Sequence, residues 1–278
     1  MKRIVTIQDI SCVGKCSLTV ALPIISAMGV ETAVIPTAVL STHTAFKNFT
    51  FCDLTKEIEP IAAHWEQEKI GFDAIYTGYL GSFEQLNLVR EFIQHFRTEK
   101  NLVFIDPVMA DNGKLYAGFT QEFADCMAQL CGQADVIVPN LSEAAFMLHR
   151  PYLEKGYTEA DIRQMLKDLT TLGTKTAILT GITLEEGKLG VMGYDSVSGS
   201  YFSYFSEYLP VSFHGTGDVF ASSLVGALTI GKSMQEALEI AVDYTVESIR
   251  KTMKDPNANW YGVNFEEALP ALIKRLNP

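Results

Sequence analysis

Long hydrophobic runs are missing from this 278-residue sequence, although 47% of its residues are apolar and 20% are charged. A membrane-spanning helix needs roughly 18 or more consecutive apolar residues, so no membrane protein is expected. The composition is that of a globular protein with a sizeable core. The opening MKRIVTIQDI also lacks the longer apolar stretch and cleavage site of a secretory signal, and we interpret it as the first buried strand of a cytoplasmic protein.

Cysteine and positive charge are also scarce. The five cysteines show no C-x-x-C spacing, which argues against a disulfide framework and suits a reducing compartment. Cys12 and Cys16 lack the nearby cysteine or histidine partners that a structural metal site requires. The 22 Lys and Arg against 33 Asp and Glu give a net charge of −11. Such a balance disfavours nucleic acid as a partner, because nucleic-acid binding normally needs a basic surface.

Linkers, internal repeats and low-complexity tracts are absent too, so we predict a single domain over residues 1–278. Short β-rich runs alternate with segments of helical period, which is typical of an α/β fold with a central, mainly parallel sheet and helices on both faces. The predicted strands are RIVTIQ, TAVIPTAVL, DAIYTGY, LVFIDP, DVIVPN and TAILTG. The predicted helices cover residues 17–28, 83–97, 121–130, 159–172 and 219–230.

Two adjacent segments break this alternation. LGVMGYD and SYFSYFSEYLP flank a Gly/Ser turn and predict an antiparallel hairpin at one edge of the sheet. The aromatic side chains of the second segment could belong to a strand core, a dimer surface or a nucleotide wall, and we favour strand packing.

Polar residues stand at the ends of several predicted strands. Asp106 follows the apolar residues of FIDP, Asn140 those of IVPN and Thr180 those of ILTG, while Asp9 follows the first strand. Each residue alone is explained as a turn former. In a parallel sheet, however, these side chains would share one rim, and ligands bind at the carboxyl ends of such strands.

Glu143 follows Asn140 by three positions and is predicted to begin the next helix. There it could hold Mg²⁺ through water near a bound phosphate, with Asp106 sharing that role. The alternative is that Asn140 or Ser142 simply caps the helix.

The loop HGTGD precedes a helix of small apolar residues. Gly215 and Gly217 allow backbone conformations closed to other residues, and converging amide groups at a helix N-terminus suit phosphate. Asp218 would weaken anion binding unless it takes a proton from a hydroxyl that attacks the phosphoryl group. An ordinary capping role for Asp218 is the alternative.

Several motifs occur together in order along nearly the whole chain: STHTAF at 41–46, GYLGS at 78–82, DPVM at 106–109, PNLSEA at 139–144 and GTGD at 215–218. This set resembles the pyridoxal/pyridoxamine (vitamin B6) kinases of the ribokinase-like superfamily. GTGD alone indicates only the superfamily, whereas GYLGS and the HT dipeptide are more specific to the B6 branch.

The resemblance implies ATP- and Mg²⁺-dependent phosphorylation of the 5′-hydroxyl of pyridoxal, pyridoxine or pyridoxamine. It makes Asp218 the general base and Gly215, Thr216 and Gly217 the anion hole. It also implies a potassium ion near the nucleotide and a homodimer. The other roles that the resemblance implies are these: Asp106 and Glu143 organise Mg²⁺ and phosphate, Asn140 and Thr180 lie on the nucleotide side, and His43, Thr44 and Tyr79 surround the pyridine ring.

One position departs from the family pattern. Many pyridoxal kinases have IQS at the end of the first strand, whereas this chain has IQD. A carboxylate at Asp9 could accept a hydrogen bond from a protonated ring nitrogen or pair with an aminomethyl group. Our hypothesis is that Asp9 shifts the preference toward pyridoxamine or another amine-bearing ring.

Two other functions remain open. A hydroxymethylpyrimidine kinase would share the fold and chemistry, and Asp9 would suit its ring, but those kinases commonly have cysteine where this chain has Asp218. A protein that binds a vitamer or nucleotide without turnover is disfavoured, because a pure binder needs no base at an anion site.

Overall fold

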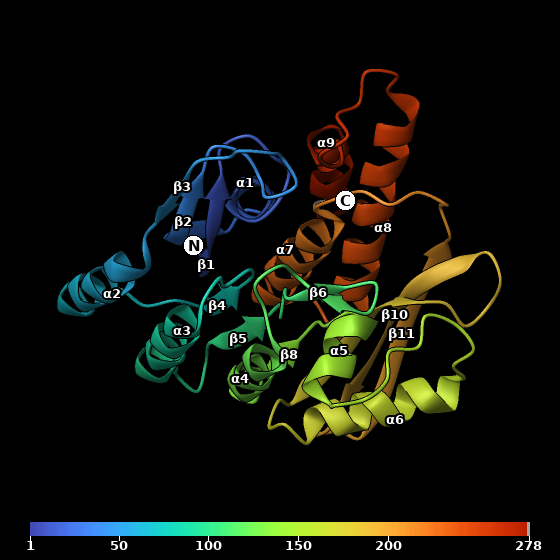
Figure 1. The fold of residues 1–278 in the computed structure, drawn as a ribbon, viewed down its shortest axis with the longest axis horizontal. Coiled ribbons are helices and arrows are strands. Elements are labelled where there is room, and N and C mark those ends of the chain that lie inside the picture. Colours follow the sequence, from blue (N-terminus) through green and yellow to red (C-terminus); the bar gives the residue numbers. More distant parts are fainter. Residues whose placement is uncertain (277–278) are drawn as a thin grey trace. The chain divides into compact units, whose positions relative to one another are not determined.

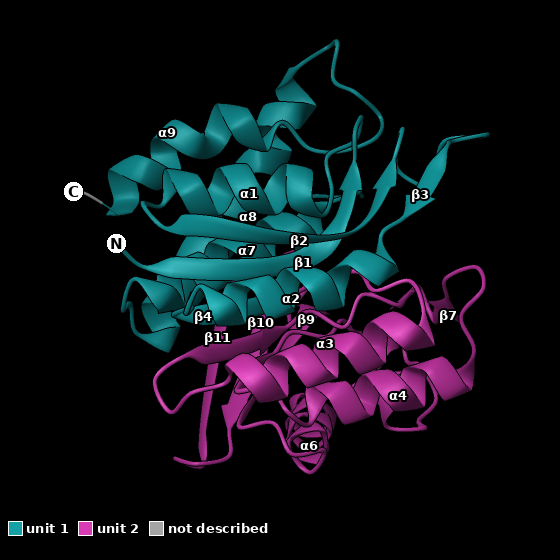
Figure 2. Cartoon of the chain, turned by 90° about the vertical axis from the view of Figure 1, so that its left-hand side faces the viewer, with its two compact units in different colours: residues 1–76, 209–278 teal, residues 77–208 magenta. Residues whose placement is uncertain are grey.

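The computed structural model describes residues 1–276, which fall into two compact units (Figure 2). Unit 1 comprises residues 1–76 and 209–278, and unit 2 comprises residues 77–208. Each unit combines strands with helices, so each is described by itself. A single domain over 1–278 stays a prediction.

The sheet of unit 1 has the strand order β4-β1-β2-β3. β1 (Arg3–Ser11) and β2 (Glu31–Leu40) pair in parallel, β3 (Phe51–Asp53) runs antiparallel to β2, and β4 (Ala74–Thr77) lies on the other side of β1. The register between β1 and β2 shifts between Gln8 and Ile10. Asp9 therefore stands at an irregularity of the first strand, where the regular alternation of side chains is broken.

Helices stack in series within unit 1. α1 (Leu18–Ala27) contacts β1 and β2, α7 (Thr216–Thr229) packs on α1, α8 (Met234–Lys254) on α7, and α9 (Phe265–Leu276) on α8 (Figure 1). The short helices η1 (Thr55–Glu57) and α2 (Ile58–Gln67) contact β2. Small residues let α7 approach α1 closely: a Cβ at Gly226 would lie 2.5 Å from the sulfur of Met28.

Unit 2 has the strand order β11-β10-β9-β8-β5. β5 (Leu102–Ile105), β8 (Val136–Ile137) and β9 (Thr176–Ile182) are parallel neighbours, whereas β10 (Lys188–Asp195) and β11 (Ser200–Glu207) are antiparallel. The remaining elements are α3 (Phe83–Phe96), the hairpin of β6 (Ala110–Asp111) and β7 (Lys114–Leu115), α4 (Gln121–Cys131), α5 (Leu141–Met147) and α6 (Glu159–Thr170).

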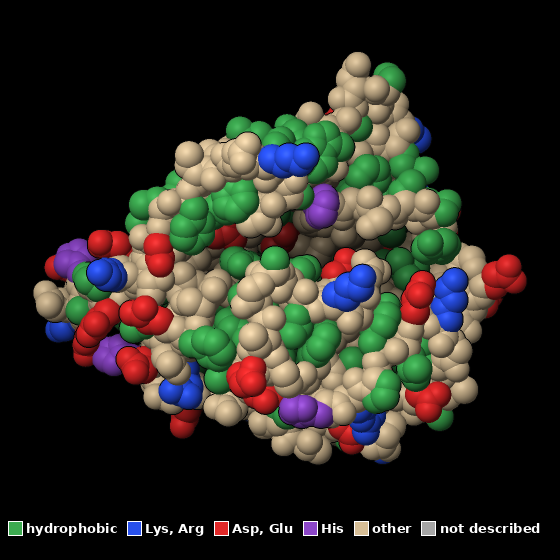
Figure 3. Space-filling model, viewed as in Figure 1, with side chains coloured by type: hydrophobic (Ala, Val, Ile, Leu, Met, Phe, Trp, Pro, Cys, Tyr) green, Lys and Arg blue, Asp and Glu red, His purple; other side chains and the backbone are tan. Residues whose placement is uncertain are grey.

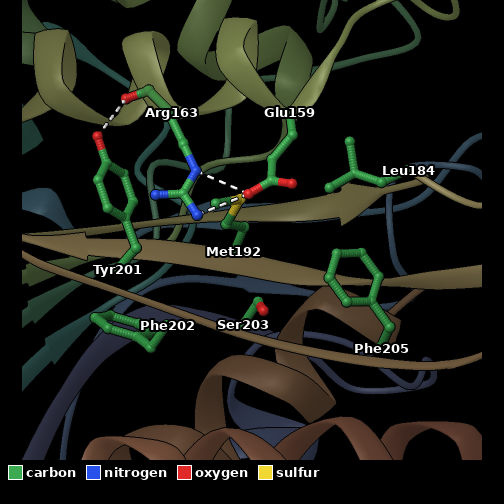
Figure 4. A pocket seen from close by; sticks show the side chains of 8 residues that line it. All are labelled: Glu159, Arg163, Leu184, Met192, Tyr201, Phe202, Ser203 and Phe205. Carbon is green, nitrogen blue, oxygen red and sulfur yellow. Dashed lines mark hydrogen bonds and ion pairs between the residues drawn. The ribbon is translucent and has the colours of Figure 1, made fainter.

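The aromatic run of the predicted hairpin belongs to β11, which is an edge strand. Tyr201 stacks beneath Arg163 of α6, whose guanidinium carbon lies 4.3 Å from the ring centre and whose Nη2 pairs with Glu159 at 2.7 Å (Figure 4). Phe202 fills the space above Gly193, where a Cβ would lie 2.1 Å from the ring. These contacts agree with strand packing.

The predicted fold class is confirmed: strands and helices alternate, the inner strand pairs are parallel, and a hairpin adds antiparallel strands. Each of the six predicted strands and five predicted helices corresponds to an observed element. The helices α2, α8 and α9 and the short strands β3, β6 and β7 were not predicted.

Charged side chains are dispersed over the face in Figure 3, where Lys and Arg stand among acidic and uncharged residues. Among residues 1–276, no helix combines the length and apolar character that are needed to cross a bilayer.

Candidate active site

The GTGD loop of unit 1 (residues 215–218), here called the anion loop, is built around Gly215, the N-cap of α7. Its backbone is left-handed (φ 78°, ψ 0°), and a Cβ there would lie 1.8 Å from the carbonyl oxygen of Lys15. The first helical hydrogen bond runs from Val219 N to Gly215 O at 3.0 Å. The N–H groups of Thr216 and Gly217 therefore have no acceptor within the helix and can serve an anion.

Asp218 occupies the third position of α7 and is not its cap. Its carboxylate accepts a hydrogen bond from the backbone N–H of Ser17. Burial, together with the charge of the nearby Asp9 carboxylate, raises the pKa of Asp218 to about 7. A carboxyl with this pKa is well matched to proton transfer near neutral pH.

Ser17 joins the two acids. Its side chain hydrogen-bonds Asp9 while its backbone N–H serves Asp218, and Ser11 Oγ donates to Asp9 at 3.2 Å. Burial also raises the pKa of Asp9. Ser17 holds φ at 50°, which is unusual for a residue other than glycine. The loop that precedes α1 therefore fixes the spacing of Asp9 and Asp218.

Cys16 lies against the same acids. Burial, followed by the charges of Asp218 and Asp9, raises the pKa of its thiol to about 12. The thiol therefore stays protonated at neutral pH and is a poor nucleophile. Sequence reasoning missed the roles of Cys16 and Ser17, because neither shows a spacing that links it to GTGD.

His43 is buried at one side of this cluster. Its Nδ1 accepts a hydrogen bond from Ala45 N at 3.1 Å, which leaves the proton on Nε2. Burial, with the neighbouring His214, lowers the pKa of His43, so the ring is neutral. Thr44 follows in an exposed position.

The predicted rim of unit 2 is confirmed for three residues. Asp106 directly follows β5, Asn140 follows β8, and Thr180 lies near the end of β9, paired with Asn140 in a parallel bridge. These strands are adjacent and parallel, so the three residues stand at one edge. Asp106 is buried.

Glu143 lies in the first turn of α5, close to the predicted start of this helix, and is buried. Its carboxylate accepts hydrogen bonds from Asn140 N at 2.8 Å and from Met109 N at 3.3 Å. Burial nevertheless raises its pKa to about 8. Both oxygens serve backbone N–H groups, so Glu143 suits a cation that is bound through water.

Asn140 is the N-cap of α5. Its Oδ1 accepts from Ser142 N and Glu143 N at 2.8 and 2.9 Å, and its Nδ2 donates to Ala110 O at 2.8 Å. The capping alternative therefore describes its observed contacts, and a nucleotide role for Asn140 stays a prediction. Thr180 Oγ1 lies 3.5 Å from Pro139 O.

Tyr79 also belongs to unit 2. Its ring stacks on Phe119 with centroids 5.8 Å apart, and Phe119 stacks on Phe123 at 4.0 Å. The structure thus groups Asp9, His43, Thr44 and the GTGD loop in unit 1, and Tyr79, Asp106, Asn140, Glu143 and Thr180 in unit 2.

The acids of unit 2 fit magnesium in one specific way. Within residues 1–276 there is no cluster of three or more His, Cys, Asp or Glu side chains arranged to hold a metal. Mg²⁺ characteristically keeps several waters and binds through one or two carboxylates plus substrate phosphates. Asp106 and Glu143 fit such a hydrated ion.

The chain matches one protein family and several solved structures. Residues 22–261 match the family described as phosphomethylpyrimidine kinase. A crystal structure from Bacteroides thetaiotaomicron, described as a phosphomethylpyrimidine kinase, is 39% identical, with a TM-score of 0.94 over 98% of this chain and 93% of that chain. An orthorhombic crystal form described as containing pyridoxal matches with a TM-score of 0.92 over 98% and 95% of the two chains.

Two further relatives are described as pyridoxal kinases. The crystal structure from Lactobacillus plantarum is 29% identical, with a TM-score of 0.90 over 99% of this chain and 97% of that chain. The protein of Arabidopsis thaliana is 25% identical, covering 91% of this chain and 83% of its own.

The relatives and the matching structures show a kinase that phosphorylates an alcohol group. The chain belongs to the phosphomethylpyrimidine kinase family, and its resemblance to the pyridoxal kinases of the ribokinase-like superfamily is confirmed.

Proposed function

We propose that this kinase transfers the γ-phosphoryl group of ATP to the 5′-hydroxyl of a vitamin B6 vitamer, namely pyridoxal, pyridoxine or pyridoxamine. Family membership and the similarity to pyridoxal kinases support the substrate class. The observation that carries the proposal is Asp218, an acid with a pKa of about 7 inside the first turn of α7.

Asp218 would act as the general base. As the 5′-oxygen forms its bond to the γ-phosphorus, the hydroxyl proton passes to the Asp218 carboxylate, and the bond from phosphorus to the bridging oxygen of ADP breaks. The Ser17 N–H keeps the carboxylate in place before the transfer.

The anion loop would stabilise the transferring group. The N–H groups of Thr216 and Gly217, at the positive end of the α7 dipole, would donate to the phosphate oxygens. Asp218 stands on the same helical turn, so the base and the donors are held by one rigid element.

In unit 2, Asp106 and Glu143 would hold the hydrated Mg²⁺. The ion supplies charge neutralisation on the phosphate oxygens when it is bound. Glu143 takes a fixed orientation from its two backbone hydrogen bonds, and a nearby cation would favour its ionised form. Thr180 and Asn140 would lie toward the nucleotide, and Tyr79, His43 and Thr44 toward the vitamer.

The proposal extends to a potassium ion near the nucleotide and to a homodimer, both of which follow from the family resemblance. It also includes a cytoplasmic location, which the cysteine usage favours. Titration of the activity with K⁺ and light scattering of the purified protein address the first two points.

A hydroxymethylpyrimidine kinase is the second candidate. The description of the matched family favours it, and the Asp9 carboxyl would accept a hydrogen bond from an aminopyrimidine. The acid at 218 argues for the B6 vitamers, since a cysteine is common at that position in hydroxymethylpyrimidine kinases.

ADP release with each alcohol tests the choice. We expect turnover with at least one B6 vitamer at a kcat/KM above that for hydroxymethylpyrimidine. Binding of vitamer and ATP without ADP release would instead support a non-catalytic binder, and a preference for hydroxymethylpyrimidine would overturn the proposed substrate.

Asp9→Ser, measured in the same assay, tests the specificity hypothesis. Because the Asp9 carboxylate would pair with the aminomethyl group, its removal should lower kcat/KM for pyridoxamine more than for pyridoxine. Unchanged relative kcat/KM among the three vitamers would remove the idea.

A further inference from the structure

A cluster of aromatic side chains lies beside His43 in unit 1 and has no role in the chemistry described so far. Trp260 and Phe46 have ring centroids 4.6 Å apart, and Tyr261 lies 5.5 Å from Phe46. His43 lies 5.8 Å from Trp260 and 5.3 Å from His214, the residue before Gly215. The cluster therefore combines the 43–46 loop, the segment after α8 and the start of the anion loop.

Trp260 is the large apolar side chain of this cluster that is most open to solvent, with 56% of its surface exposed. Large aromatic side chains are usually buried in a monomeric protein. An exposed one that stands next to polar groups is typical of a binding site. The ring of Phe46 lies against Trp260 at an interplanar angle of 43° and supports the indole from one side.

The cluster is continuous with the two acids. A Cβ at Gly14 would lie 3.2 Å from His43 Cδ2 and 3.4 Å from Ser11 Cβ. Gly14 therefore lies between His43 and Ser11 and packs closely against both. Ser11 in turn donates a hydrogen bond to Asp9, which acts electrostatically on Asp218. The aromatic side chains therefore lie near the acids, and His43, Gly14 and Ser11 stand between them.

The segment that carries Trp260 is held firmly. Asp255 Oδ1 accepts from Asn257 N at 2.8 Å, and Asn264 Nδ2 donates to Asp255 Oδ2 at 3.0 Å. Lys15 Nζ bonds Asn264 Oδ1 at 3.1 Å and Glu266 Oε2 at 2.8 Å.

Lys15 has a second function in this arrangement. Its carbonyl oxygen lies against Gly215, and its Cβ lies where a side chain at Gly262 would be, 2.3 Å from the ideal Cβ position. Lys15 therefore connects the anion loop with the segment that carries Trp260. Because these contacts fix the backbone of that segment, they also fix the exposed position of Trp260.

We propose that Trp260, backed by Phe46, is the stacking wall for the pyridine ring of the vitamer, an inference that rests on the proposed function. Stacking suits this ligand because the ring is flat and electron-poor when protonated, and the indole face carries partial negative charge. His43 would close the edge of the wall next to the acids.

Kinetics of Trp260→Ala provide the first test, with Trp260→Phe as the conservative variant. Loss of the stacking surface should raise the KM for pyridoxine roughly 3- to 10-fold, while kcat and the KM for ATP stay within about twofold. Trp260→Phe should restore most of the affinity. Met253→Ala, which removes another exposed apolar side chain from unit 1, serves as the matched control and should change none of these constants.

A second measurement uses a protein that keeps Trp260. The chain has two tryptophans, so Trp65→Phe leaves Trp260 as the single emitter. Acrylamide should quench this emission efficiently in the free protein, and saturating pyridoxine should reduce the Stern–Volmer slope at least twofold.

The outcomes separate the two proposals. Unchanged acrylamide quenching and an unchanged KM in Trp260→Ala, with vitamer turnover intact, would overturn the stacking wall and leave the kinase function standing. A loss of kcat and ATP affinity together with pyridoxine affinity in Trp260→Ala would also overturn it, because this pattern indicates a general structural role. Absence of vitamer turnover and of pyridoxine protection in the Trp65→Phe protein would overturn both.

Discussion

At the scale of single residues, the proposed chemistry depends on two carboxyl groups and on the serine between them. Asp9 and Asp218 are both desolvated and repel one another, and both effects raise the pKa of Asp218, to about 7. Ser17 limits this effect because it donates hydrogen bonds to both. The same environment keeps the thiol of Cys16 protonated.

The pH profile of kcat/KM is the prediction at this scale. Asp218 must be ionised to accept a proton, so activity should fall about tenfold per pH unit below an apparent pKa of about 7. Asp9→Asn removes the like charge and should move this acidic limb to lower pH. ADP release between pH 5 and 9 measures it, and an identical limb in both proteins would show that Asp9 does not set the pKa.

The sequence predicts some of these residues and misses others for a physical reason. Asp106, Glu143 and Asp218 stand at the ends of regular elements, where the rule for parallel sheets applies directly. Ser17 and the proposed stacking residue Trp260 lie in loops whose course depends on tertiary contacts. Their positions could not be obtained from periodicity.

At the scale of elements, the anion site depends on the fit between the start of α7 and the loop before α1. Gly215 is left-handed and touches Lys15 O, so a side chain is excluded by both conformation and space. This contact positions the free N–H groups of the first turn.

Gly215→Ala should therefore displace the anion loop and lower kcat/KM by about 10²-fold or more. Gly231→Ala is the matched control, since Gly231 is also left-handed (φ 92°) but its Cβ would meet nothing within 4 Å. The control should lose stability alone and keep its kcat/KM. Steady-state kinetics and thermal melts of both variants decide the matter, and equal losses of activity would contradict the role of the Lys15 contact.

The unpredicted elements show where sequence patterns were informative and where they were not. Ser233 and Glu236 form a capping box at the start of α8, so the spacing S-x-x-E was a usable signal for that helix. β6 and β7 have two residues each and pair only with one another, and such short strands carry no periodicity.

For the whole molecule, the raised pKa values of Asp218 and Glu143 link stability to pH. The pKa of Asp218 rises from 3.8 to about 7 and that of Glu143 from 4.5 to about 8 on folding. The folded state therefore binds more protons than the unfolded chain in this range, and stability should decrease as the pH rises from about 4 to about 8. The protein retains two acids at the expense of stability at neutral pH.

Asp218→Asn tests the central claim, that this carboxylate accepts the proton of the attacking hydroxyl. The variant should melt a few degrees higher than the wild type at pH 8, because it lacks the buried charge, and this melt confirms that it is folded. Its kcat for pyridoxine phosphorylation should fall roughly 10²- to 10⁴-fold while the KM for pyridoxine changes little. A folded Asp218→Asn protein with an unchanged kcat would contradict the account.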